Sequence, residues 1–430
     1  MRSLGGARPW LVISWLLTLA ACTSAPTRDG ASSLSASPSL PVSSLVTPTP
    51  VQTTSSAPAI SVEVVSTDWT RAIDLAVEGH EVSVAVGAGD RIVYEHEGTT
   101  PRIPASNQKL LTSMAALDIF GPDHRFLTMA ASLSPPSDGV IQGDLWLVGS
   151  GDPEVDASSM ARLAVSIRAA GVVRITGGVI GDTTAFTREW WAPGWVPGLS
   201  RSFVTRTTAL AFDQNAGSGL PEDAAAGSLT AALRVRGVEV MREASTGETP
   251  RGLDRVAVTR SRPLRDLLAV QNHGSVNFYA ETLLKAIGAE AGVDTGSTAA
   301  GAEGVTAWAA SRGVTARVMD GSGLSHLDLV SAQDLATLLL LAQGEPWGKV
   351  LDASLAPPGE GTLEGRLVGV PVRAKTGTLF ESAVSSLSGY VTDAGGTRVA
   401  FSVISRGLDR SAAIAMEDSI VRALAGARLG

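Results

Sequence analysis

Apolar and polar residues alternate along two short segments near the front of the folded part of the chain. The segments cover residues 81–86 and 91–96, and the four residues between them read Gly-Ala-Gly-Asp. Alternation with a period of two puts one face of a strand into the core, and glycine-rich connections suit tight turns. The pattern therefore predicts an antiparallel β-hairpin.

A helical pattern follows this hairpin. In residues 106–120, which read SNQKLLTSMAALDIF, apolar side chains recur at roughly helical spacing, and Pro104 stands just before them. Such spacing gathers the apolar side chains on one side of a helix, and proline is common near a helix start. We expect a helix here, with Ser106 in its first turn.

The C-terminal third contains the same two kinds of pattern. Residues 277–292 and 331–343 are predicted to be helices, and a closing helix is expected from about 411 to 425. Residues 385–391 and 398–405 alternate around Asp-Ala-Gly-Gly-Thr, which predicts a second hairpin. The fold class is therefore mixed α/β, with antiparallel pairing at both ends of the folded chain.

Between these parts lies a segment with a different pattern of apolar residues and glycines. From about residue 125 to 262, short apolar stretches are punctuated by glycine, and residues 188–198 are rich in Trp, Pro and Gly. No fixed-period repeat is present in the sequence. We interpret residues 131–262 as an inserted mixed α/β region, consisting of one insertion or a trimmed pair, between catalytic parts at 66–130 and 263–430.

The first 65 residues carry export signals in place of a core pattern. Two arginines precede a short apolar run, which ends at Leu-Ala-Ala-Cys22. A run this short indicates a signal peptide, because spanning a bilayer takes about 20 residues. The last four residues resemble a bacterial lipobox, although they also suit ordinary signal peptidase. We predict a signal peptide with lipobox over 1–22, and lipid anchoring through Cys22 at the outer face of the cell membrane.

A Ser/Thr/Pro-rich stretch covers residues 23–65 and lacks the apolar spacing needed to fold. We interpret it as a disordered tether that gives the folded body reach from the membrane, and a tail without that role would have the same composition.

Composition narrows the function classes. The chain has 430 residues, 44% of them hydrophobic, and a net charge of -8 with a pI near 5.3. This balance offers no broad basic surface, so a nucleic-acid partner is not expected. The five histidines are scattered without a His-Glu-x-x-His pattern, and no phosphate-binding glycine loop is present. We therefore expect neither a metal nor a cofactor.

Lysine is rare in this chain, which draws attention to Lys109. Only four of the 34 basic residues are lysines, and Lys109 follows Ser106 by three positions. Residues three apart on a helix share a face, so the amine can reach the hydroxyl. A desolvated lysine can lose its proton and activate a serine, whereas arginine remains charged. A lone Ser-x-x-Lys is nevertheless weak evidence, because it arises often by chance.

Two further motifs strengthen this hypothesis. Ser275-Val276-Asn277 opens a helical pattern, and Lys375-Thr376-Gly377-Thr378 follows an alternating stretch. Their order resembles the signature of the penicillin-binding proteins and β-lactamases. The segments PRIPASNQKLLT, LVGSGDP, SVNFYAETLLK, DGSGLS and AKTGTL resemble the landmarks of peptidase family S13, the class C low-molecular-mass penicillin-binding proteins, over roughly residues 66–430.

The resemblance implies a penicillin-binding-protein/β-lactamase-like transpeptidase fold, an antiparallel sheet flanked by helices. It also implies a serine-type D-alanyl-D-alanine carboxypeptidase/endopeptidase that acts on peptidoglycan stem peptides and is acylated by β-lactam antibiotics. The roles that it implies are a nucleophile at Ser106, an acylation base at Lys109, a proton relay at Ser275, and Asn277 holding both the substrate amide and Lys109.

The third motif has implied roles as well. Lys375 and Thr376 would bind the terminal carboxylate, and Gly377 would let the substrate approach the strand as an added edge. The backbone N–H groups of Ser106 and Thr378 would form an oxyanion hole.

Alternatives remain open from the sequence. Val276 stands where the family usually has a polar residue, which keeps a non-catalytic wall-binding lipoprotein in view. A β-lactamase-like hydrolase is disfavoured, because no Glu-x-x-Leu-Asn run follows Ser275. Lys285 is expected to decorate a helix, and the tryptophans at 190, 191 and 195 are expected to serve packing. The segment 320–323 is interpreted as a turn, and the resemblance places it at the rim of the active site.

Overall fold

The computed structural model describes residues 68–198, 200–290 and 295–429. The predicted signal peptide with Cys22 and the predicted tether lie outside the described residues. Among the described helices, none combines the length and the apolar character needed to cross a bilayer.

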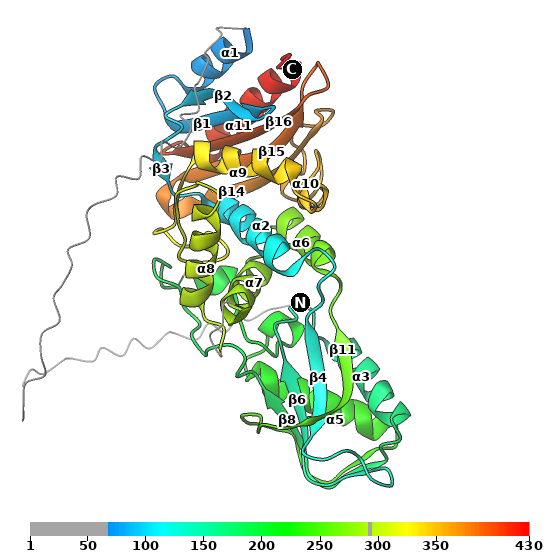
Figure 1. The fold of residues 1–430 in the computed structure, drawn as a ribbon. Helices are drawn as coiled ribbons and strands as arrows, with labels where there is room; N and C mark the ends of the chain where they lie inside the picture. Colours follow the sequence, from blue (N-terminus) through cyan, green and yellow to red (C-terminus); the bar gives the residue numbers. More distant parts are fainter. Residues whose placement is uncertain (1–67, 199, 291–294, 430) are drawn as a thin grey trace, which may run out of the picture. The chain divides into compact units, whose positions relative to one another are not determined.

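A mixed sheet-and-helix body is built around one antiparallel sheet (Figure 1). Within the described residues this sheet has five strands, in the order β14-β15-β16-β1-β2. The predicted hairpins supply four of them, and both hairpins are confirmed. The strands are β1 (Glu81–Ala88), β2 (Arg91–His96), β14 (Val372–Leu379), β15 (Val384–Thr392) and β16 (Arg398–Arg406).

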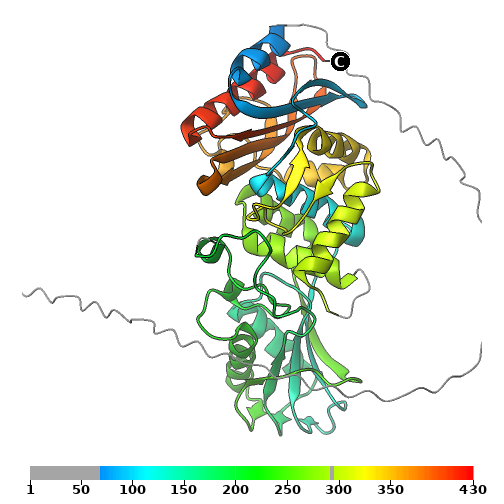
Figure 2. The ribbon, with the colours of Figure 1, turned by 90° about the vertical axis from the view of Figure 1, so that its left-hand side faces the viewer.

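Each face of this sheet buries a different layer of helices (Figure 2). On β1, Val82, Val84 and Val86 pack with α1 (Asp68–Val77) and α11 (Arg410–Gly426), whereas Ala85 packs with α9 (Ala332–Gly344). Successive side chains of a strand point to opposite faces, so the alternation read from the sequence becomes two separate cores. The helix-flanked fold class is confirmed.

The α9 face continues into a thick helical layer that holds the chemistry. Its central helix is α2, which packs against α6, α7 and α8 around a large apolar core. A short 3₁₀ turn, η1 (Ala105–Asn107), precedes α2, and β3, β12 and β13 form a small sheet nearby. The bounds are α2 (Gln108–Phe120), α6 (Leu264–His273), α7 (Asn277–Glu290), α8 (Thr298–Ala310), α10 (Gly348–Ser354), β3 (Pro101–Arg102), β12 (Ala316–Arg317) and β13 (Leu329–Ser331).

The middle of the chain forms its own sheets and its own core. The larger sheet has the order β10-β8-β6-β4-β11, a smaller one has the order β5-β7-β9, and one apolar cluster serves both. The division of the chain into catalytic and inserted domains stays a prediction. The elements are β4 (Leu127–Ser132), β5 (Val140–Ile141), β6 (Leu145–Gly149), α3 (Ala157–Ala169), β7 (Arg174–Ile175), β8 (Val179–Asp182), α4 (Ser200–Phe203), α5 (Pro221–Val235), β9 (Glu239–Val240), β10 (Ser245–Thr246) and β11 (Asp254–Arg260).

Candidate active site

Ser106 lies where the central sheet meets the helical layer. It occupies η1, one turn before the helix proper begins at Gln108, and so slightly ahead of its predicted place. The preceding residue, Ala105, has a left-handed backbone with φ of 48°. Ser386 on β15 donates a hydrogen bond of 2.7 Å to the Pro104 carbonyl, which ties this turn to the sheet. The side chain of Ser106 is thereby fixed at a strained turn and remains partly exposed.

The amine of Lys109 lies 3.1 Å from the hydroxyl of Ser106, as the three-residue spacing predicted. Its Nζ also lies 2.6 Å from Asn277 Oδ1 and 2.7 Å from the Ser322 carbonyl. The side chain of Lys109 is fully buried. A neutral amine has two hydrogens and one lone pair. Because the two other acceptors can receive the two hydrogens, the lone pair is left for the Ser106 hydroxyl.

Burial changes the charge state of this amine. Desolvation lowers the pKa of Lys109 to about 8, while the Asp320, Glu281 and Asp328 carboxyls act in the opposite direction. A pKa of about 8 leaves roughly a tenth of the molecules with a neutral amine at pH 7. Lys109 is therefore available as a base near neutrality.

The segment 320–325 lies directly beneath Lys109, and its importance was only hinted at by the sequence. Glu281 Oε1 accepts hydrogen bonds from the backbone N–H groups of Gly321 and Ser322, so it fixes the carbonyl that receives Lys109. Asp320 accepts from the N–H groups of Gly323 and Ser325. Sequence reasoning missed Glu281, because a glutamate in the middle of a helical pattern carries no local sign of burial.

The first and third residues of the middle motif line the cleft, and the residue between them points away from it. Ser275, which has a left-handed φ of 54°, and Asn277 line the cleft, whereas Val276 packs against the helical core. The departure at Val276 therefore leaves both polar side chains of the motif, Ser275 and Asn277, in the cleft. Asn277 Oδ1 faces Lys109, and its Nδ2 donates to the Phe203 carbonyl at 3.0 Å.

The third motif lies on β14, the edge strand of the central sheet. Lys375 is fully buried and donates to Ser275 Oγ at 2.9 Å and to the Thr376 carbonyl at 2.7 Å. Burial, and then the charge of Lys109, hold the pKa of Lys375 well below its usual range. Lys375 thus links the second and third motifs.

Gly377 is the point of closest approach between β14 and the turn that holds Ser106. A Cβ at this position would collide with Ser386 Oγ and lie 2.9 Å from the amide nitrogen of Ser106. Glycine is therefore required by packing against the turn.

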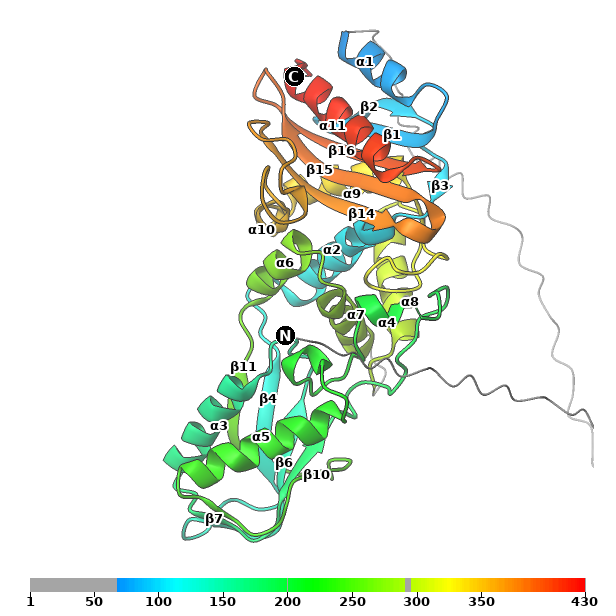
Figure 3. The ribbon, with the colours of Figure 1, turned by 180° about the vertical axis from the view of Figure 1, so that it is seen from behind.

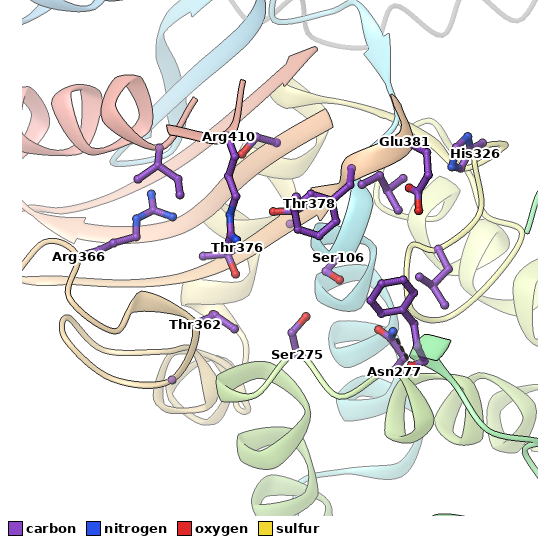
Figure 4. A pocket seen from close by; sticks show the side chains of 18 of the residues that line it. Ser106, Ser275, Asn277, His326, Thr362, Arg366, Thr376, Thr378, Glu381 and Arg410 are labelled. Carbon is purple, nitrogen blue, oxygen red and sulfur yellow. Dashed lines mark hydrogen bonds between the residues drawn. The ribbon is translucent and has the colours of Figure 1, made fainter. Parts of the chain in front are cut away.

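All three motifs open into one cleft of about 540 Å³ (Figure 4). Ser106 and Ser275 point into it from opposite sides, and Thr376 and Thr378 project from β14. The walls are completed by residues that sequence reasoning did not select, among them Val196, Phe203, Thr362, Arg366, Phe380 and Arg410. All eight predicted site residues converge on this cleft, six lining it and the two lysines buried behind their serine partners.

Lys285 corrects a further expectation. It is 1% exposed, not a surface decoration, and its ammonium donates to backbone carbonyls of Thr187 and Glu189. Desolvation lowers the pKa of Lys285 to about 8. The apolar spacing of the helix could not reveal this, because its acceptors lie almost a hundred residues away in the sequence.

Comparison with known proteins decides the family. The chain matches the D-Ala-D-Ala carboxypeptidase 3 (S13) family over residues 70–219 and 218–427. This chain belongs to that family. Its resemblance to S13, inferred from the short motifs, is therefore confirmed, as is the prediction of a serine-type peptidase of this kind.

Two relatives share most of their length with this chain. A D-alanyl-D-alanine carboxypeptidase from Actinomadura sp. is 31% identical over 449 residues, with 82% of each chain covered. D-alanyl-D-alanine carboxypeptidase DacB from Haemophilus influenzae is 23% identical and covers 73% of this chain and 82% of its own.

Solved structures of a penicillin-binding protein show the same fold. Penicillin binding protein 4 from Haemophilus influenzae superposes with a TM-score of 0.73, at 22% identity, over 84% of this chain and 100% of its own. A second structure of that protein, complexed with a β-lactam, gives a TM-score of 0.66 at 23% identity, over 83% of this chain and 99% of its own. The predicted penicillin-binding-protein fold is confirmed.

Proposed function

We propose that this S13 protein is an exported D-alanyl-D-alanine carboxypeptidase/endopeptidase that cleaves peptidoglycan stem peptides through an acyl-enzyme on Ser106. The observation that carries the proposal is the position of the buried Lys109 amine, 3.1 Å from Ser106 Oγ with two further acceptors in place. Such an arrangement directs the lone pair of the neutral amine at the serine proton.

The first half of the reaction forms the acyl-enzyme. Lys109 takes the proton of Ser106 while Oγ attacks the peptide carbonyl, and the resulting oxyanion is met by the backbone N–H groups of Ser106 and Thr378. Loss of one such donor costs about 3 kcal/mol of transition-state stabilisation. The C–N bond then breaks, and Ser275 relays to the leaving amine the proton that Lys109 took from Ser106, which leaves Lys109 neutral again. Its contact with Lys375 Nζ at 2.9 Å gives the relay a fixed partner.

The second half of the reaction releases the peptide. Water replaces the departed amine, gives up a proton to the same base and attacks the acyl carbonyl, which restores the Ser106 hydroxyl. A β-lactam ring would follow the first half and leave a slowly released acyl group, because its leaving amine stays tethered.

Substrate would be held along the edge of the sheet. β14 is an edge strand, so an extended peptide can pair with it as an added strand, and Gly377 keeps this strand close to the turn that holds Ser106. Lys375 and Thr376 would bind the terminal carboxylate, and Asn277 the substrate amide.

The decisive test compares Ser106→Ala with Ser166→Ala, a control at an exposed serine on α3. Release of D-alanine from a stem pentapeptide should fall at least about 10⁴-fold in the first variant and stay unchanged in the second. A labelled penicillin should give a persistent adduct on Ser106, detected by mass spectrometry of the wild-type protein.

Other outcomes of that test contradict the proposal. Rapid hydrolysis of the penicillin without an adduct would assign a β-lactamase-like hydrolase. Absence of both adduct and D-alanine release would assign a non-catalytic wall-binding protein.

A further inference from the structure

A long connection from the middle of the chain crosses to the catalytic cleft. We call residues 183–198 and 200–210, which run from the end of β8 past α4, the strap (Figure 3). It supplies Val196 and Phe203 to the cleft wall. The strap is therefore part of the surface that a bound peptide would touch.

Several hydrogen bonds join the strap to residues around Lys109. Trp195 Nε1 donates to Asp320 Oδ2 at 2.6 Å, and the Ser325 hydroxyl donates to the Pro193 carbonyl at 2.7 Å. The Phe203 carbonyl accepts from Asn277 Nδ2 at 3.0 Å. The strap thus touches both the loop beneath Lys109 and the side chain that faces Lys109.

The buried side chain of Lys285, on α7, is hydrogen-bonded to the backbone of the strap. Its Nζ donates to the carbonyls of Thr187 at 3.1 Å and Glu189 at 2.5 Å on the outgoing limb, and to that of Thr207 at 3.5 Å on the returning limb. An ammonium has three hydrogens, so a single group can serve both limbs at once. A buried charge is costly unless it is hydrogen-bonded, which accounts for the carbonyls gathered around it.

We propose that Lys285 is a positioning residue, which clamps both limbs of the strap so that Val196 and Phe203 form a fixed wall of the substrate cleft. The proposal rests on the proposed peptidase function and deepens it, because it assigns the recognition of longer stem peptides to this wall. A substrate that fills only the space beside Ser106 does not need the wall.

The experiment compares Lys285→Met with Lys349→Met, which removes an exposed lysine of α10. Two substrates are used. One is a stem pentapeptide, and the other is a short thioester that fills only the space beside Ser106. In Lys285→Met, kcat/KM for the pentapeptide should fall about tenfold more than kcat/KM for the thioester, mainly through KM. Lys285→Arg, which keeps a permanent charge, should recover part of the loss.

Hydrogen exchange gives a readout that needs no turnover. Amides of residues 185–210 should exchange faster in Lys285→Met than in Lys349→Met, while the strands β4, β6 and β8 remain protected. If turnover fails in every sample but strap exchange rises, the proposed function is wrong and the clamp stands. Equal losses for both substrates, together with unchanged strap exchange, would overturn the clamp.

A measurement on the wild-type protein covers the case in which Lys285→Met does not fold. The charges that act on Lys285 come from Glu281 on its own helix and from Glu189 on the strap. Its pKa of about 8 means that the ammonium is lost as pH rises above that value. The pentapeptide-to-thioester ratio of kcat/KM should therefore fall more steeply between pH 7 and 9.5 in the wild-type protein than in Lys285→Arg, which keeps its charge while sharing Lys109 and Glu281. A ratio with the same pH dependence in both proteins would count against the clamp.

Discussion

At the scale of single residues, the charge of Lys109 is set by opposing influences. Burial favours the neutral amine, and the carboxyls of Asp320, Glu281 and Asp328 favour the ammonium. Acylation needs the neutral form, so its rate should rise with pH as Lys109 loses its proton around pH 8. The acid limb of the pH–rate profile for acylation reports this pKa directly.

We predict that Asp320→Asn shifts that limb to lower pH by about half a unit to one unit, because a negative charge that favours the ammonium is removed. Asparagine retains an acceptor for the Gly323 N–H but loses Oδ2, which accepts from the Ser325 N–H and from Trp195 Nε1, so hydrogen exchange of residues 320–325 is measured beside the limb. Stopped-flow acylation by a chromogenic β-lactam, from pH 5.5 to 9.5, measures the limb. The control Asp352→Asn, on α10, should leave the pH of the acid limb unchanged. A shift to higher pH in Asp320→Asn would contradict the electrostatic account.

Gly377 offers a second test at this scale. Gly377→Ala would force β14 away from the Ser106 turn, since the added methyl meets Ser386 Oγ and the Ser106 amide. We expect kcat/KM for acylation to fall by about 10²-fold while the fold is retained. Gly344→Ala is the control, because a Cβ at that position would meet open space. Wild-type acylation in Gly377→Ala would show that this contact does not position the nucleophile.

At the scale of elements, the loop between α10 and β14 is pinned to α11 by an ion-pair cluster. Arg366 donates to Glu417 and Asp418, and the side chain of Glu417 is 1% exposed. Burial raises the pKa of Glu417, and Arg366 is the main influence that lowers it. Removing the arginine would leave a buried carboxyl without its cation.

We predict that Arg366→Met lowers the free energy of unfolding by about 3 kcal/mol, because the partner left behind is buried. Arg234→Met breaks a pair with Glu243 in which both side chains are well exposed, and should cost under about 1 kcal/mol. Urea denaturation followed by tryptophan fluorescence compares the two variants. Equal costs would mean that burial does not govern these pairs.

Elements with strong local periodicity could be predicted from the sequence. Both hairpins and the helix that carries Lys109 were found in this way, and the motif spacing brought Ser106 and Lys109 together correctly. Lys285 was misjudged because its acceptors are backbone carbonyls 78 to 98 residues away, and carbonyls have no sequence signature. Glu281 was missed for the same reason, since it acts on backbone N–H groups of a distant loop.

At the scale of the whole molecule, the proposed site needs a location beside its substrate. The predicted export signal and Cys22 lie outside the described residues, so export and anchoring stay proposals based on the sequence. We predict that Cys22→Ala moves the protein from the membrane fraction to the soluble fraction, because the thiol that would take the lipid is gone. Fractionation and labelling with radioactive palmitate measure this, with Thr23→Ala as the control. Palmitate labelling of Cys22→Ala, or none of the wild type, would contradict lipidation.

The reacting groups and one wall of the cleft come from separate parts of the sequence. The groups proposed to make and break bonds come from the three short motifs, while one wall of the cleft comes from the strap. The side chains of Val196 and Phe203 can change while Trp195 and the backbone carbonyls of the strap keep their contacts with Asp320, Ser325 and Asn277. A directed-evolution library confined to the strap would therefore be an economical way to obtain enzymes with new preferences among wall peptides.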